Sequence, residues 1–327
     1  MHRYVLKRII LLIPVLLGVS MLVYCILDLA PGDAADILAP DDATLEEKEA
    51  LREELGLNRP VLVRYFEYMW KLLHGDLGES YLSPVSVWSA FTQKAPNTLK
   101  LGLASVIFAV GTSLPLGIYA ARHRGSWKDA ISMILAILGL SMPNFWLGLL
   151  LMLLFALRLG WLPSGGADMG LRSLILPTIT IGTGMMATLT RTTRSSMLDV
   201  IRQDYLRTAR AKGVTEEVVI KKHALKNALI PIITIIGTML GGILGGATLT
   251  ESVFSWPGVG RLIIDSLNGR DTPVVTGCII MTTMFFSVVL LAVDLIYAFV
   301  DPRIKAQYAS KSKKGGEKKD GEKAAEA

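Results

Sequence analysis

Six long apolar stretches alternate with polar segments along this chain. Each stretch is about long enough to cross a hydrocarbon core of roughly 30 Å as a helix that rises 1.5 Å per residue. The pattern therefore predicts six transmembrane helices, over residues 9–27, 99–121, 131–157, 174–190, 229–250 and 274–300. The first stretch does not read as a cleaved signal peptide, because no small-x-small site closes it before the following PGDAAD.

The polar segment after the first stretch, residues 31–97, is expected to fold into helices. Thr44 and Glu47 can form a capping box for a helix that Gly56 ends. After Pro60, apolar side chains recur at helical spacing, namely Leu62, Tyr65, Phe66, Met69, Leu72 and Leu73. This amphipathic helix is expected to lie on the membrane surface or to pack on the spans, and docking of an external partner is the alternative.

Lysine and arginine are distributed unevenly over the two sides that six spans define. The side that carries both termini holds 23 of these residues, and the other side holds 10. Because positive charge is concentrated in cytoplasmic loops, both termini are expected in the cytoplasm. The net charge of +6 is explained by this topology, and no motif predicts nucleic-acid binding.

The sequence contains little that predicts catalysis or a bound cofactor. The 2 cysteines and 4 histidines have no ligand-like spacing, so no metal site is expected. There is no glycine-rich phosphate loop, nucleophile elbow or HExxH motif. Only Lys100 and Asp294 lie clearly inside the predicted spans, which is too few for a proton relay. The pattern indicates a passive conduit that another protein drives.

Two polar residues in the apolar stretches are candidates for a transport pathway. Asp294 lies in the last stretch, and an intramembrane carboxylate is a functional candidate, although a structural hydrogen-bonding or ion-paired role is equally open. Asn144 follows Pro143 in the third stretch, where the proline can kink the helix. Glycines at positions 237, 241 and 245 predict close helix packing within the chain.

A basic segment, residues 191–228, separates the fourth and fifth stretches. Within it Leu206, Ala209 and Gly213 recur on one face of a short helix that Gly213 can end. Small residues on that face would let it insert into a partner's groove. The basic residues around it are Arg207, Arg210 and Lys212. Composition alone leaves two interpretations open: a handle for a separate protein, or a loop that contacts anionic lipid.

The same segment resembles the cytoplasmic loop of ABC-importer permeases, with its Glu-Ala-Ala-x₃-Gly pattern. RTARAKG followed by HALKNALIP is similar to the peptide and nickel permease group, in which Arg at position 207 and Lys at position 226 are normal departures. Arg207-Thr208-Ala209 matches the Glu-Ala-Ala positions, and Gly213 matches the glycine. Other motifs that resemble the first of the two permeases, in order up to Lys305, are LAPGD, HGDLGES, SMPNFWLG, LGWLPSGG, ESVFSWPGVGRL and DPRI.

The resemblance implies an all-α integral membrane protein with the type I ABC importer permease fold. Its expected parts are an N-terminal transmembrane helix (1–30), an extracytoplasmic helical segment (31–97), a five-helix core with a cytoplasmic coupling loop (98–305, loop 191–228) and a disordered charged tail (306–327). The residues expected to couple to an ATPase are Tyr205, Leu206, Arg207, Ala209, Arg210, Lys212 and Gly213. No cofactor is expected in this chain, since partner ATPases would bind ATP and Mg²⁺.

The implied partners are a second, homologous permease, two ABC ATPase subunits and an extracytoplasmic solute-binding protein. The expected function is uptake of dipeptides or oligopeptides through a multi-pass subunit of a bacterial or archaeal cell membrane. Nickel chelates, glutathione and oligosaccharides are alternative cargoes for the same machine. An intramembrane enzyme or a stand-alone channel is the interpretation from a different class, and the coupling-type loop argues against it.

Overall fold

The computed structural model describes residues 2–300, and within this range the chain is helical with no β-strand, only an isolated bridge between Glu79 and Ser86. The side chains not described are those of residues 2–5, 7–9, 244, 246, 294 and 296–300. The tail predicted over 306–327 lies outside the described residues, as does the DPRI motif. Among the described residues, five helices are long and apolar enough to cross a membrane, and a bent pair of helices makes six if it is counted as one span.

Two long parallel helices, α5 (Val87–Arg122) and α8 (Leu171–Ile201), form the centre of the bundle. They approach closely because glycines face the partner: a Cβ on Gly182 would lie 2.5 Å from Phe108 Cδ1. Ser86 caps α5 through the backbone N–H of Ser89. The helix therefore begins well before the apolar run, and the boundary placed at residue 97 falls inside it.

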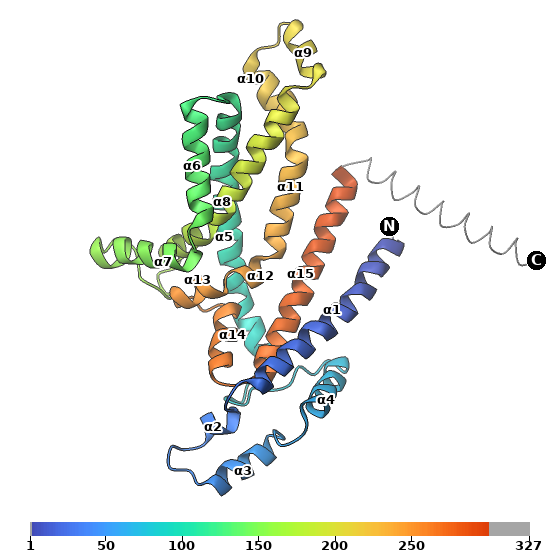
Figure 1. Ribbon diagram of the computed structural model, residues 1–327, viewed down its shortest axis with the longest axis vertical. Coiled ribbons are helices and arrows are strands. Elements are labelled where there is room, and N and C mark those ends of the chain that lie inside the picture. The colour runs from blue at the N-terminus through green and yellow to red at the C-terminus, as the bar shows by residue number, and fades with distance from the viewer. Residues whose placement is uncertain (1, 301–327) are drawn as a thin grey trace, which may run out of the picture.

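Helices α1 (His2–Leu29) and α15 (Thr272–Val300) pack against each other beside this centre, as Figure 1 shows. Helix α11 (Leu225–Gly241) packs between α8 and α15. A Cβ on Gly237 would overlap Val293, and one on Gly241 would lie 3.2 Å from Phe286. The predicted packing of these two glycines within the chain is confirmed. Gly245 has no heavy atom within 4 Å of such a Cβ and takes no part in the contact.

The third apolar stretch is not the single helix that its length predicted. Helix α6 (Trp127–Ser141) is followed by α7 (Asn144–Leu151) and a π-helical turn, η1 (Met152–Arg158), and the two parts meet at 100°. Pro143 supplies no N–H and forces Met142 out of the helical conformation, to φ −83 and ψ 124. Figure 1 shows α7 projecting sideways from the bundle.

The fifth stretch is also interrupted. Helix α11 is preceded by α10 (Glu216–Val218) and a π-helical segment, η2 (Val219–Ala224). It ends at Gly241, and two short helices, α12 (Ile243–Gly246) and α13 (Thr248–Val253), follow. Glycine is a poor helix former, so the run of glycines that permits close packing also ends the straight helix.

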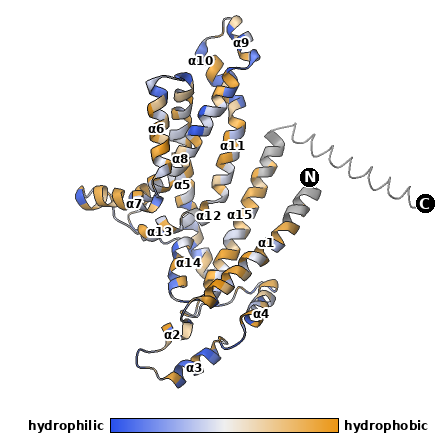
Figure 2. Ribbon diagram, viewed as in Figure 1, coloured by the Kyte–Doolittle hydropathy of each residue, from blue (hydrophilic) through white to orange (hydrophobic). Residues whose placement is uncertain are grey.

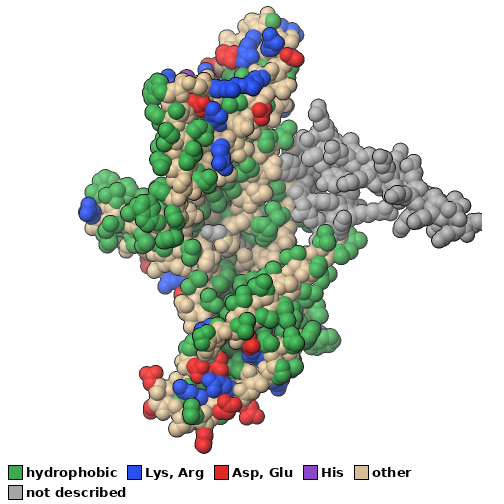
Figure 3. Space-filling model, in the orientation of Figure 1, with side chains coloured by type: hydrophobic (Ala, Val, Ile, Leu, Met, Phe, Trp, Pro, Cys, Tyr) green, Lys and Arg blue, Asp and Glu red, His purple; other side chains and the backbone are tan. Residues whose placement is uncertain are grey.

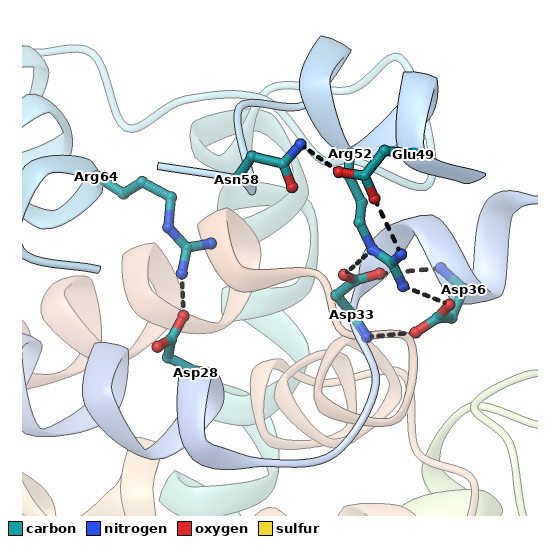
Figure 4. Close-up of polar contacts among 7 residues, drawn as sticks. All are labelled: Asp28, Asp33, Asp36, Glu49, Arg52, Asn58 and Arg64. Atoms are coloured by element: carbon teal, nitrogen blue, oxygen red, sulfur yellow. Dashed lines mark hydrogen bonds and ion pairs between the residues drawn. The ribbon is translucent and has the colours of Figure 1, made fainter. Parts of the chain in front are cut away.

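The segment after α1 forms three helices, α2 (Ala34–Leu38), α3 (Leu45–Glu54) and α4 (Val61–Leu73). The capping box of Thr44 and Glu47 is confirmed, and Gly56 has a left-handed φ of 69° after α3. Figure 4 shows Arg52 joining α3 to α2 through Asp33 at 2.7 Å and Asp36 at 2.9 Å. The segment is therefore a folded polar cap.

The polar regions gather at opposite ends of the molecule. Figure 1 places α2–α4 at one end with α14 (Val259–Asn268) close by, and it places α10 with α9 (Asp204–Ala211) at the other. Figure 2 shows the helices between these ends as mostly hydrophobic. We refer to the two ends as the α3 end and the α9 end. Helices that cross a membrane in alternating directions place their polar connecting segments at two opposite ends in this way.

Candidate functional site

The basic loop at the α9 end forms the short helix α9, which ends as the sequence predicted. Gly213 has φ 78°, a left-handed conformation that glycine adopts without strain. The N–H of Val214 bonds to the carbonyl of Ala209, and that of Gly213 bonds to the carbonyl of Arg210. These two bonds make a Schellman motif, which stops the helix and turns the chain toward α10.

The apolar face of α9 points toward its own chain. Leu206 is fully buried among α8, η2 and α11, where it packs with Met197, Val219 and Ala224. Ala209 packs against the same cluster. The sequence pattern had assigned this face to a partner's groove, and the structure corrects that assignment. A short amphipathic helix buries its apolar stripe on whatever lies nearest, and here η2 and α11 lie beneath it.

The other face of α9 is exposed and carries two basic side chains and one acidic one, and we call it the outward face. It consists of Asp204, Tyr205, Arg207, Thr208, Ala211 and Lys212. The Arg207 side chain is 78% exposed, and its nearest ion-pair partner is Asp204 at 3.8 Å. The Tyr205 hydroxyl oxygen accepts a hydrogen bond from Asn227 Nδ2 at 2.7 Å, which links α9 to α11. Figure 3 shows lysine and arginine side chains gathered at this end.

Arg210 has a different role from its basic neighbours. It donates two hydrogen bonds to Glu216, each of 2.9 Å, and so joins α9 to α10. This carboxylate raises the pKa of the Arg210 guanidinium above its ordinary value. Of the seven predicted coupling residues, Tyr205, Arg207 and Lys212 therefore face outward. Leu206 and Ala209 anchor the helix, and Arg210 and Gly213 shape its end.

A pocket of about 250 Å³ lies between α5, α8, α11 and α12, where α7 begins. Its lining residues are Gly102, Asn144, Ile181, Gly184, Met185, Thr188, Met239, Gly242, Ile243 and Ala247. The bend before α7 brings Asn144 to this pocket, and a Cβ on Gly184 would lie 3.5 Å from its Oδ1 atom. The pocket thus combines apolar walls with neutral polar groups. Asp294, the other predicted pathway residue, has a side chain outside the described part of the structure.

The α3 end contains a buried carboxylate that the sequence reasoning missed. Glu251, at 0% exposure, accepts hydrogen bonds from the Thr98 hydroxyl at 2.6 Å and from the Arg261 backbone N–H at 3.1 Å. Thr98 in turn accepts a bond from the Val259 N–H at 2.8 Å. A Cβ on Gly258 would overlap the carboxylate. The two glycines of PGVG near a lone acid were the only sequence signal of this site.

The ionisation of Glu251 is governed by two opposing effects. Burial raises the pKa of its carboxyl group, and the hydrogen bonds from Thr98 and from the backbone of Arg261 and Gly260 lower it, burial being the larger. Both carboxylate oxygens accept hydrogen bonds, so the site fits the ionised form geometrically. One side chain thereby joins the start of α5 to the α13–α14 turn.

Metal-ligating side chains do not cluster in the part of the chain that the structure describes. Cys25 and Cys278 are free cysteines there. The site is therefore built from a positively charged helix face, a neutral pocket and a buried structural carboxylate.

Comparison with known proteins identifies relatives over nearly the whole chain. Residues 113–306 match the family model described as "Binding-protein-dependent transport system inner membrane component". Residues 1–102 match the corresponding N-terminal model, "Binding-prot-dependent transport system membrane comp, N-term". The two family matches leave two parts of the chain unmatched: the short stretch 103–112 between them, and the charged tail from residue 307.

Individual relatives are similar over the same length. The glutathione transport system permease protein GsiC of Salmonella typhi is 43% identical over 305 residues, which cover 93% of this chain and 99% of the relative. The dipeptide transport system permease protein DppB of Alkalihalophilus pseudofirmus is 41% identical over 332 residues, covering 93% and 100%.

Among solved structures, an inward-facing conformation of the MetNI methionine ABC transporter matches with a TM-score of 0.56. The identity is 18%, and the match covers 64% of this chain and 95% of that chain. At this identity the likeness shows the fold alone. It confirms the type I importer permease fold that the sequence motifs implied.

Proposed function

This chain belongs to the family of binding-protein-dependent transport system inner membrane components, and from that membership we propose that it conducts short peptides across the cell membrane. It is a multi-pass permease subunit of an ABC importer, a non-catalytic component that works with ATPase and substrate-binding partners. The observation that carries the cargo proposal is the match, over 93% of the chain, to permeases named for dipeptide and glutathione transport. Glutathione is itself a tripeptide, so both names indicate short peptides.

The outward face of α9 is proposed to contact the ATPase subunit. Its basic side chains are exposed, and among the described residues Arg207 has only a long, exposed ion pair with Asp204. Leu206 fixes the helix to the ends of α8 and α11, so a force on α9 reaches both spans. This proposal places the α9 end in the cytoplasm, in agreement with the excess of lysine and arginine there. ATP and Mg²⁺ would be bound by the ATPase and not by this chain.

The pocket beside Asn144 is proposed to form one wall of the translocation pathway. A short peptide carries amide groups and a variable side chain, and a lining of neutral polar and apolar groups suits such a cargo without binding it tightly. The other wall would come from a second, homologous permease in a heterodimer. A solute-binding protein would then deliver cargo at the α3 end, which this orientation places outside the cell.

The test is transport by the reconstituted importer. The chain is co-expressed with its neighbouring permease, ATPases and solute-binding protein, and the complex is placed in liposomes containing ATP. We expect ATP-dependent uptake of a labelled dipeptide that unlabelled dipeptide inhibits and that requires the binding protein. Uptake of a nickel chelate or an oligosaccharide, with none of any peptide, would refute the proposed cargo while leaving the permease role intact.

Glutathione is the second candidate cargo, because the GsiC relatives match as well as the DppB relative does. The same liposomes discriminate between the two. If labelled glutathione enters and unlabelled dipeptides fail to compete, the importer is specific for glutathione. Mutual competition would instead indicate a general short-peptide importer.

A further inference from the structure

Helix α4 has two apolar faces, and only one of them is covered by the chain. Tyr65 and Tyr68, 5% and 8% exposed, pack against Tyr24 of α1 and Ile280 of α15. The neighbouring face carries Leu62, Phe66, Trp70 and Leu73, which are 50%, 67%, 67% and 80% exposed. Four large apolar side chains at spacings of four, four and three residues form a continuous stripe along the helix.

The contacts of α4 with α1 show how deep it lies. The Tyr65 hydroxyl donates to the carbonyl of Leu17 at 3.0 Å and lies 3.0 Å from Ser20 Oγ. Arg64, the preceding residue, pairs with Asp28 at the polar end of α1, as Figure 4 shows. Leu17 and Asp28 are separated by about 16 Å along a helix that rises 1.5 Å per residue. Helix α4 therefore lies alongside the outer part of the Ile10–Leu29 span and not beyond its end.

The contacts of α4 with α15 place it at the same depth. A Cβ on Gly277 would lie 3.3 Å from the Tyr68 hydroxyl, and Gly277 is about 7 Å along the helix axis from Thr272, where α15 begins. Ile280, one turn deeper, is in the same cluster as Tyr68. The exposed stripe of α4 is consequently level with apolar residues of two membrane spans.

Two of the three charged side chains of α4 are paired within the chain, and the third lies in the last turn of the helix. Arg64 is paired with Asp28, and Glu67 is paired with Arg59 at 2.8 Å. Lys71, in the last turn, is exposed and long enough to extend its ammonium group toward lipid phosphates. On α1, Leu22 and Ile26 are 58% and 56% exposed within the same span, so a lipid-facing surface continues from α1 to α4.

We propose that α4 is an in-plane membrane anchor, with Leu62, Phe66, Trp70 and Leu73 immersed in the acyl chains of the leaflet on the α3 side. The occupant of the stripe is lipid, because the stripe lies at the depth of the spans and continues the lipid-facing surface of α1. The anchor holds the polar cap formed by α2 and α3 at a constant height above the bilayer. The anchor involves this helix alone and is the same whichever cargo the importer carries.

Spin-label accessibility in the complete importer, reconstituted in liposomes, tests this anchor. On a background with Cys25→Ser and Cys278→Ala, a nitroxide is attached to Phe66→Cys. We expect relaxation by oxygen to exceed relaxation by a water-soluble nickel chelate. The ratio should match that of the span control Leu22→Cys and exceed that of Leu45→Cys, on the exposed start of α3, by roughly tenfold, because a polar chelate partitions poorly into hydrocarbon.

Two results would overturn the proposal. A label on Phe66→Cys that the nickel chelate reaches as readily as Leu45→Cys would place the stripe in water. A label that neither reagent reaches would show that another protein covers it. If Phe66→Cys does not assemble, Leu73→Cys provides a second position on the stripe. A second measurement needs no label: the quenching of tryptophan fluorescence by brominated phospholipid is compared between the wild type and Trp70→Phe. Equal quenching in the two would again refute lipid contact.

Discussion

The two ends of the molecule use charge in opposite ways. At the α3 end, Glu251 is fully buried, and the groups that bond to it come from its own chain. At the α9 end, the basic side chains of the outward face are exposed and weakly paired. A buried charge without partners costs several kcal/mol, whereas an exposed charge costs almost nothing. The Glu251 site is therefore complete as it stands, whereas the outward face of α9 leaves its charges available to another chain.

The comparison also separates two kinds of glycine. Gly258 is required because the Glu251 carboxylate occupies the space of a Cβ. Gly213 has no heavy atom within 4 Å of such a Cβ, and it is required only for its left-handed φ of 78°. Substitutions at the two positions should therefore fail for different reasons.

The largest effect is expected for Gly258→Ala. The new methyl group overlaps a carboxylate that three hydrogen bonds hold in place, so it must displace the whole network. We expect a loss of about 3 kcal/mol, measured as a lower unfolding temperature of the purified complex. The control is Gly111→Ala, on α5, where no heavy atom lies within 4 Å and a stabilisation of up to about 1 kcal/mol is expected. Equal changes in unfolding temperature at the two positions would show that the space around Gly258 is not tightly packed.

Thr98→Val should cost about 2 kcal/mol at neutral pH, because it removes a donor to a buried carboxylate without changing the volume of the side chain. Thr190→Val is the matched control. Thr190 is equally buried, and its hydroxyl has no partner among the described residues, so its loss should be neutral or slightly stabilising. Unfolding temperatures of the two variants measure the difference directly.

The cost of Thr98→Val should also depend on pH. Burial raises the folded pKa of Glu251 above its ordinary value of 4.5, so the contribution of this group is fully present below pH 4.5 and is lost as the pH rises through the folded pKa. Removing a hydrogen bond that lowers this pKa raises it further. The deficit of the variant should therefore be smaller in acid than at neutral pH. The part that remains in acid comes from the Val259 N–H, which loses its acceptor at every pH. A constant difference between pH 4 and pH 8 would contradict the linkage to Glu251.

Gly213→Leu is expected to cost about 1–2 kcal/mol in stability, from backbone strain alone. Its main effect should be on function, since a changed turn alters how α9 presents its outward face. Transport-coupled ATP hydrolysis should be lost while the chain still inserts in the membrane. Gly213→Asn, which tolerates a left-handed conformation, is the control and should retain coupling. Full coupling in the leucine variant would count against α9 as the contact with the ATPase.

Arg207→Glu should change stability least, by less than about 0.5 kcal/mol, because this side chain is 78% exposed. It should nevertheless weaken binding of the ATPase by roughly tenfold, which corresponds to about 1.4 kcal/mol. Lys221→Glu serves as the control, since Lys221 is 70% exposed, lies on η2 and is not part of the outward face. Titration of the ATPase onto the purified membrane subunits gives its affinity for each variant. An equal loss of affinity in Arg207→Glu and Lys221→Glu would show that only net charge matters.

The sequence predicted the spans more accurately than the sites. Apolar length is set by the membrane, so all six stretches correspond to helices or to a bent pair. The bend at Met142 and Pro143 could not be predicted, because a transmembrane helix can contain a proline with or without a sharp break. The same limit applies to α9: an apolar stripe shows that something covers it, and not whether that is the same chain. Glu251 was missed because one acidic residue gives no indication of its donors.

The 100° angle between α6 and α7 has a mechanical consequence. A straight helix that is pushed along its axis moves its far end by the same distance in the same direction. When α6 is pushed from the α9 end, the force arrives nearly perpendicular to α7. Gly148 of α7 is seated against Phe254 and Thr180. Any axial displacement of α6 would therefore press α7 sideways against these two residues and would not move it along its own length.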